Sequence, residues 1–163
     1  MKRLLLGLVV LAACSSPPEP KPETPAERRA RCEKRLVDAG DKDPWAFYEL
    51  AQLDEQEGEL ARAIDEYGSA VALLPAKHYT GPALGLGRVH LKLGRWEPAR
   101  RMFDEVLQTV PEDPSSYRKN ADYREAALGL KEVYAHVKDE RAAARARQRF
   151  LDELGGKPSE WPE

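Results

Sequence analysis

Residues 44–75 read PWAFYELAQLDEQEGELARAIDEYGSAVALLP, and this stretch decides the fold. Asp43 followed by Pro44 is the N-cap and first-position pair that opens a helix. Gly58 stands where that first helix has to end with a positive φ angle. In the second half, apolar side chains recur at helical spacing, at Ala63, Tyr67, Ala70 and Leu74. The stretch therefore predicts two helices joined by a tight turn.

The same pattern returns twice further along the chain. A second copy begins 36 residues later, so that Phe103 corresponds to Tyr67 and Gly94 to Gly58. A weaker third copy follows another 44 residues on, where residues 127–134 read ALGLKEVY against ALGLGRVH at residues 83–90. Repeats of this period indicate stacked helix pairs that cover one another's apolar faces. We therefore expect an all-α solenoid.

These copies resemble the tetratricopeptide repeat, a helix–turn–helix unit of about 34 residues. In the first copy the pattern residues are Phe47, Leu50, Ala51, Gly58, Ala63, Tyr67, Ala70 and Pro75, with Asp54 in place of an aromatic. In the second they are Ala83, Leu86, Gly87, His90, Gly94, Ala99, Phe103 and Pro111. The third departs further, because Lys131, Lys138 and Arg147 take the small, glycine and aromatic positions. The resemblance implies a short solenoid of about seven helices that binds other proteins and is not an enzyme.

The helical domain is expected to span residues 26–154, with repeats at about 44–75, 80–111 and 124–154. Thr24 and Glu27 form a capping box for a helix over residues 26–39, which we expect to cover the first end of the stack. Residues 155–163 are expected to form a flexible tail.

The N-terminus predicts export. Residues 1–13 carry a basic start and a short apolar run, which is typical of a secretory signal and too short to cross a bilayer. The run ends in Leu11-Ala12-Ala13-Cys14, which resembles the lipobox of bacterial lipoproteins. The resemblance implies cleavage before Cys14, acylation of that cysteine and anchoring in the lipid bilayer. A plain secretory signal followed by a stray cysteine is the alternative.

The proline-rich residues 14–25 fit an extended tether between the lipid and the domain. Ser15, directly after the acylated position, resembles the default sorting signal for the outer membrane. We therefore expect an exported protein that is anchored to the outer membrane and faces the periplasm.

Charge and residue usage exclude several function classes. The chain has 26 basic and 28 acidic residues, and loss of Lys2 and Arg3 with the signal leaves 24 against 28, or a net charge of −4. This sign disfavours nucleic acid. Cys32 is then the only thiol beside the acylated one, so it has no partner for an internal disulfide. We expect no metal, cofactor or small-molecule substrate, because the histidines at 78, 90 and 136 share no ligand spacing and no catalytic constellation is found.

In repeats of this kind, the first helices line a groove that holds a peptide or a helix of a partner protein. Carrying the positions over assigns the groove to Trp45, Tyr48, Glu49, Gln52, Gln56, Leu84, Arg88, Leu91, Lys92, Leu128, Glu132 and His136. Trp45 and Tyr48 are of the type found at binding hot spots, and Arg88 and Lys92 are expected to hold acidic groups.

The leading hypothesis is a non-catalytic adaptor or scaffold in an envelope complex, such as an assembly, secretion or pilus-type machine. One alternative is a regulator that captures a cell-wall enzyme. Another is an anchor for an anionic envelope polymer, which would use Arg141, Arg145, Arg147 and Arg149 of the last helix.

Overall fold

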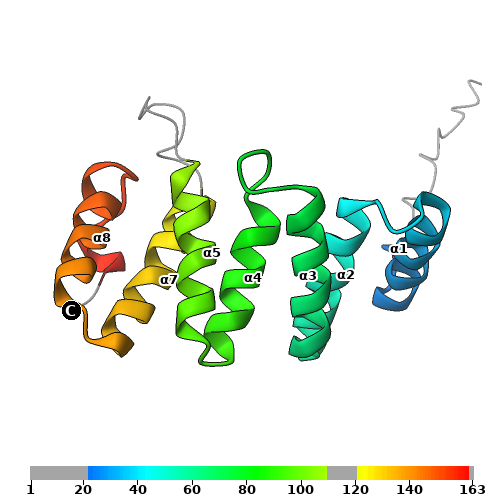
Figure 1. Ribbon diagram of the computed structural model, residues 1–163, viewed down its shortest axis with the longest axis horizontal. Coiled ribbons are helices and arrows are strands. Elements are labelled where there is room, and N and C mark those ends of the chain that lie inside the picture. Colours follow the sequence, from blue (N-terminus) through cyan, green and yellow to red (C-terminus); the bar gives the residue numbers. More distant parts are fainter. Residues whose placement is uncertain (1–21, 110–120, 162–163) are drawn as a thin grey trace, which may run out of the picture.

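The computed structural model describes residues 22–109 and 121–161, and within them it contains helices and no strand. The helices are α1 (Pro25–Ala39), α2 (Pro44–Glu57), α3 (Leu60–Leu73), α4 (Gly81–Lys92), α5 (Trp96–Gln108), α7 (Ala121–Val137) and α8 (Glu140–Asp152), followed by the 3-10 turn η1 (Pro158–Glu160). They stand side by side in one row (Figure 1), and these seven helices of the described ranges confirm the predicted all-α solenoid. The predicted signal, Cys14 and the first part of the tether lie outside the described residues.

Three helix pairs make up the body of the row: α2 with α3, α4 with α5, and α7 with α8. The side chain of Asp43 caps α2, since its Oδ1 accepts hydrogen bonds from the backbone N–H of Trp45 at 3.0 Å and of Ala46 at 3.1 Å. Gly58, at φ 82°, follows α2 in the left-handed region that favours glycine. Lys138 takes the same conformation in the third pair, at φ 57°, so that turn forms without the expected glycine.

Helix α1 packs on α2 at the first end of the row and begins with the capping box of Thr24 and Glu27. Thr24 Oγ1 accepts a hydrogen bond from Glu27 N at 3.3 Å, and Glu27 Oε2 accepts one from Thr24 N at 2.8 Å. Cys32 on α1 is buried in one apolar cluster with Ala46 and Leu50 of α2. Burial raises the pKa of the Cys32 thiol to about 11, so it stays protonated and packs as a small apolar residue.

A charged cluster under α1 explains why Asp54 replaces an aromatic of the repeat pattern. The Asp54 side chain is fully buried, and its Oδ1 accepts hydrogen bonds from Arg29 of α1 at 2.6 Å and from Arg62 of α3 at 3.0 Å. Glu66 of α3 belongs to the same cluster, where burial and then a hydrogen bond with Asp54 raise its pKa to about 8. In the first repeat, a position that is usually apolar therefore holds an aspartate, which binds Arg29 of the capping helix α1.

Successive pairs are joined by an aromatic ring that packs against a glycine of the next pair. An added Cβ at Gly85 of α4 would lie 2.4 Å from the ring of Tyr67 in α3. One at Gly129 of α7 would lie equally close, 2.4 Å, to the ring of Phe103 in α5. The Phe103 ring also packs against Gly87 of α4, where an added Cβ would lie 2.7 Å from the ring. These contacts need glycine because no side chain fits between the helices.

A contact of the same kind, between an aromatic ring and a glycine, is found at the other end of the row, where the sequence predicted a flexible tail. An added Cβ at Gly156 would lie 2.1 Å from the ring of Phe150, and the Trp161 ring lies 5.4 Å from that ring. Trp161 is only 5% exposed, and Lys131 of α7 lies 5.7 Å from its ring. The flexible-tail prediction is therefore wrong for residues 155–161, which cover the apolar side that a further repeat would otherwise cover.

The buried aromatic of the third pair is also not at the expected position. Arg147 aligns with Tyr67 and Phe103, but the ring that fills this part of the core belongs to Phe150, one turn further along α8. Within the described ranges, no helix combines the length and apolar character needed to cross a membrane.

Candidate partner-binding groove

The first helices of the three pairs contact one another along the row. Helix α4 contacts both α2 and α7 directly, whereas each second helix packs mainly on first helices. Between α2 and α4 is a hollow of about 260 Å³. It is lined by Gln52, Glu55, Gln56, Arg88 and Lys92. Four of these five residues were assigned to the groove from sequence, and the structure adds Glu55. We call the hollow formed by the five residues the first-helix groove.

Glu55 is the centre of an ionic network on the floor of this groove. Arg88 donates to both of its carboxylate oxygens at 2.7 Å, and Lys92 Nζ lies 2.7 Å from Oε1. The Tyr67 hydroxyl also donates to Oε2 at 2.9 Å. Burial alone would raise the pKa of Glu55, but these donors lower it to about 2. The carboxylate is therefore ionised and held in place at all ordinary pH values.

Arg88 holds helices of this chain together. Besides its paired contact with Glu55, it donates from Nη1 to Glu125 of α7 at 2.8 Å. It therefore links the first helices of all three pairs. The expectation that Arg88 is open to acidic groups of a partner is corrected, because two carboxylates of this chain already occupy it.

Two further groove assignments are corrected by burial and pairing. Leu84 is only 4% exposed and belongs to the apolar core between α4, α5 and α7, so it cannot line an open surface. Glu49 faces α1, where it pairs with Arg31 at 2.8 Å and with Arg35 at 3.0 Å. The sequence alignment could not reveal this, because α1 lies outside the repeats.

Aromatic side chains gather near the start of α2, the helix that also carries Gln52 and Gln56 of the groove. Trp45 is 44% exposed, and its ring lies 4.8 Å from that of Tyr79. Tyr48 meets Tyr79 edge-on at 5.7 Å and lies 6.0 Å from Tyr67. Tyr79, itself 37% exposed, stands in the connection between α3 and α4, where no repeat position points to it. Trp45 and Tyr79 form what we call the aromatic edge.

The positions assigned from the third pair do not reach the hollow. Leu128 of α7 is partly buried against the core, as is Leu91 of α4 in the second pair. Glu132 and His136 are exposed, and the His136 ring stacks on Trp96 at 3.8 Å with 23° between the planes. The candidate site is therefore centred on the first two repeats.

No chemistry of a metal centre is built into this surface: among the described residues, no three His, Cys, Asp or Glu side chains gather where they could hold one ion. His90, the one histidine at a core position of the repeat, has its pKa lowered by burial.

Comparison with known proteins supports the repeat assignment. The tetratricopeptide repeat family matches residues 54–119, from the last turn of α2 through α5 and beyond. The matched segment contains the hollow residues Glu55, Arg88 and Lys92. A search among curated proteins found no match to the chain.

Proposed function

We propose that this tetratricopeptide repeat protein is a membrane-anchored, non-catalytic adaptor that holds an extended segment of a partner protein in the first-helix groove. The repeat family points to protein–protein interaction. The observation that carries the finer proposal is the hollow itself, where polar side chains of two successive repeats face one another.

The free groups of the groove suit a peptide backbone. Gln56 is exposed and Gln52 is half-buried, and neither amide is held by another described side chain. A glutamine amide both donates and accepts, so two of them on one helix can pair with the N–H and C=O groups of an extended chain. Lys92 is paired with Glu55 but keeps 47% of its side chain exposed, so its remaining N–H groups can donate to the segment from the rim. The aromatic edge can hold an apolar side chain of the same segment.

Anchoring is proposed from the N-terminal sequence alone. Acylation of Cys14 and the proline-rich tether would hold the repeats close to a bilayer and leave the groove free to face the periplasm. A complex of the envelope, such as an assembly, secretion or pilus-type machine, is the setting that this placement supports. Mass spectrometry of the mature protein tests the anchor, since Cys14→Ser should remove the acyl chains and release the protein from membranes.

The structure weakens the alternative of an anionic-polymer anchor on α8. Arg149 pairs with Glu153 at 2.9 Å and donates to the Leu107 carbonyl of α5 at 2.7 Å, so it fastens α8 to the row. Arg147 is half-buried, whereas Arg141 and Arg145 are exposed. Of the four arginines, only Arg141 and Arg145 are therefore exposed and outside the ion pairs formed among the described residues. Capture of a cell-wall enzyme would use the same groove and differs only in the identity of the partner.

Affinity purification of the lipidated chain from its own membranes tests the proposal. The groove variant is Gln52→Arg with Gln56→Arg, which fills the hollow and adds two charges without touching the core. The control is Gln108→Arg with Gln148→Arg, at exposed positions on the second helices α5 and α8. We expect one stoichiometric partner that the groove variant loses at least tenfold and the control retains. Equal recovery with both variants would contradict the groove assignment.

A further inference from the structure

A second and larger cleft lies between α5 and α8. Both helices pack on α7, and the space left between them measures about 720 Å³. Its lining shares no residue with the first-helix groove. The volume is within the range of about 300–1,000 Å³ in which proteins bind ligands and anchor side chains. We call it the α5–α8 cleft.

The floor of this cleft is apolar and rigid. Trp96, Tyr134 and Val137 contribute to it, and Val137 leaves 52% of its side chain exposed. The Trp96 ring is fixed by its stack on His136. An apolar floor in a rigid setting can receive a large side chain without the cost of ordering the floor residues first.

The lining of the cleft has more positive than negative side chains, with three arginines against Glu97 and Asp139. Glu97 pairs with Arg100 at 2.6 Å, and Asp139 is turned to the start of α8, where it accepts a hydrogen bond from Ala142 N. Arg95 and Arg145 are both exposed and form no ion pair with another described residue. We call these two arginines the rim of the cleft.

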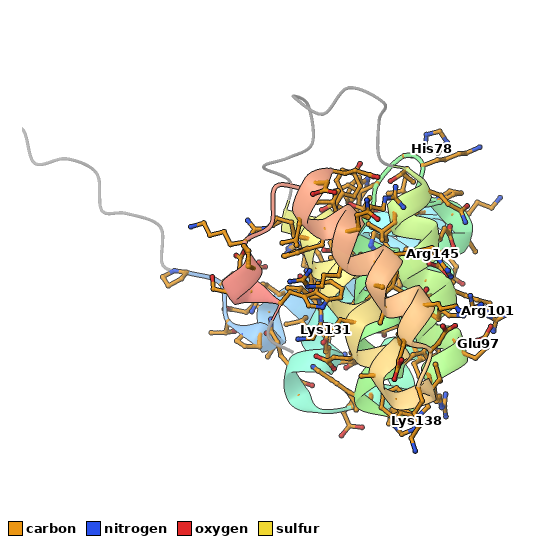
Figure 2. The ribbon with its side chains drawn as sticks, turned by 90° about the vertical axis from the view of Figure 1, so that its left-hand side faces the viewer. His78, Glu97, Arg101, Lys131, Lys138 and Arg145 are labelled. Carbon is orange, nitrogen blue, oxygen red and sulfur yellow. The ribbon has the colours of Figure 1, made fainter. Side chains whose placement is uncertain are left out.

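Figure 2 looks along the row from the α8 end and shows the side of the molecule on which this rim lies. Arg145 stands on the same side of α8 as Glu97 and Arg101 of α5, whereas Lys131 lies on the other side, near η1. Two residues that line the cleft, Arg145 and Glu97, therefore lie on the side of α8 that faces away from η1.

We propose that the α5–α8 cleft is a second protein-binding site, which takes an acidic peptide segment with one large apolar side chain. The apolar side chain would sit on Trp96, Tyr134 and Val137, and carboxylates on either side of it would meet Arg95 and Arg145. Tryptophan, tyrosine and arginine are the residue types that dominate binding hot spots, which favours a protein segment as the occupant. Charge complementarity with the rim requires that segment to be acidic. The site does not depend on the first-helix groove, and with both occupied the adaptor would bridge two partners.

A synthetic peptide library tests the proposal directly. The purified full-length, lipidated chain in detergent is applied to immobilised 12-residue peptides that vary independently in acidic, basic and aromatic content. We expect enrichment of peptides with acidic residues around one aromatic or leucine. Raising the salt concentration from about 0.05 to 0.5 M should weaken this binding, because it screens the exposed rim charges.

Three variants identify the site that such peptides use. Arg95→Glu with Arg145→Glu should lower peptide affinity at least tenfold, and Val137→Ser should lower it through the floor alone. Arg101→Glu, an exposed charge reversal on α5 outside the lining, should leave the affinity unchanged. The groove variant Gln52→Arg with Gln56→Arg should also bind these peptides normally, which separates this site from the proposed function.

Several results would overturn the proposal. The proposal is wrong if the peptides selected from the library are not enriched in acidic residues. It is also wrong if Arg95→Glu with Arg145→Glu binds the peptides as the wild type does, or if Arg101→Glu loses peptide binding. Another such result is stronger binding to anionic phosphatidylglycerol vesicles than to any peptide, if it disappears in Arg95→Glu with Arg145→Glu, because the rim would then recognise lipid. Circular dichroism of each variant confirms that its helices are intact.

Discussion

Replacement of Gly129 by alanine tests the ring-on-glycine contact that joins the helix pairs. The added Cβ would lie 2.4 Å from Phe103 Cε2, 2.5 Å from Cζ and 2.9 Å from Cδ2, whereas ordinary contact begins at 3.4 Å. The ring cannot turn away easily, since it is 2% exposed and closed in by Gly87 from α4. The substitution should therefore force α7 away from α5.

The expected magnitude follows from two opposing effects. Overpacking of a closed core costs up to about 3 kcal/mol. Alanine in place of glycine inside a helix returns about 1 kcal/mol through its higher helix propensity. Gly129→Ala should thus lower the free energy of unfolding by about 2 kcal/mol.

Gly68→Ala in α3 is the matched control. An added Cβ there meets no atom within 4 Å, so only the propensity gain of about 1 kcal/mol remains and the protein should become more stable. The two variants should differ by about 3 kcal/mol, or roughly 12 °C in midpoint temperature at about 4 °C per kcal/mol. Urea and thermal unfolding followed by circular dichroism at 222 nm measure both. If Gly129→Ala unfolds at or above the wild-type midpoint, the account of how the pairs interlock is wrong.

Three further predictions concern the groove floor, the α1 cluster and the C-terminal cover. Arg88→Ala leaves the Glu55 carboxylate short of its main donor, so urea unfolding should show a loss of roughly 2 kcal/mol and the pKa of Glu55 should rise in an NMR titration. Glu66 has a raised pKa of about 8 in the folded protein, so its contribution to stability is fully present below about 4.5 and is lost as pH rises through 8. Glu66→Gln stays neutral, and unfolding free energies measured from pH 5 to 9 should therefore fall less steeply than in the wild type. Trp161→Ala opens a cavity beside Phe150 and should cost about 3 kcal/mol, with faster amide hydrogen exchange in α8 than in α3.

The repeat geometry could be predicted from sequence because it depends on local signals. Asp43 before Pro44, the glycine at 58 and the apolar spacing around Tyr67 each fix a helix end or a buried face within a few residues. The recurrence of ALGL at 83–86 and 127–130 marks the place where a ring of the preceding pair meets a glycine.

The two ends of the row and the pairing on the groove floor could not be predicted in the same way. Glu49 is taken by arginines of α1, and Trp161 returns to Phe150 across a loop, so neither contact has a fixed spacing in the sequence. Arg88 occupies an outward position in the repeat pattern, but its partners come from α2 and α7. A pattern within one repeat shows which side chains point outward and does not show which of them satisfy one another.

Site-specific photo-crosslinking in native membranes tests the central claim most directly. A photoreactive amino acid is placed at Gln56 in the first-helix groove or at Gln108 on α5, within the full-length lipidated chain. We predict one major crosslinked protein from position 56, which is not among the products from position 108. This product should be lost when Gln52→Arg is added. An identical set of products from both positions, or a product from position 56 that survives Gln52→Arg, would contradict the claim that the first-helix groove holds the partner.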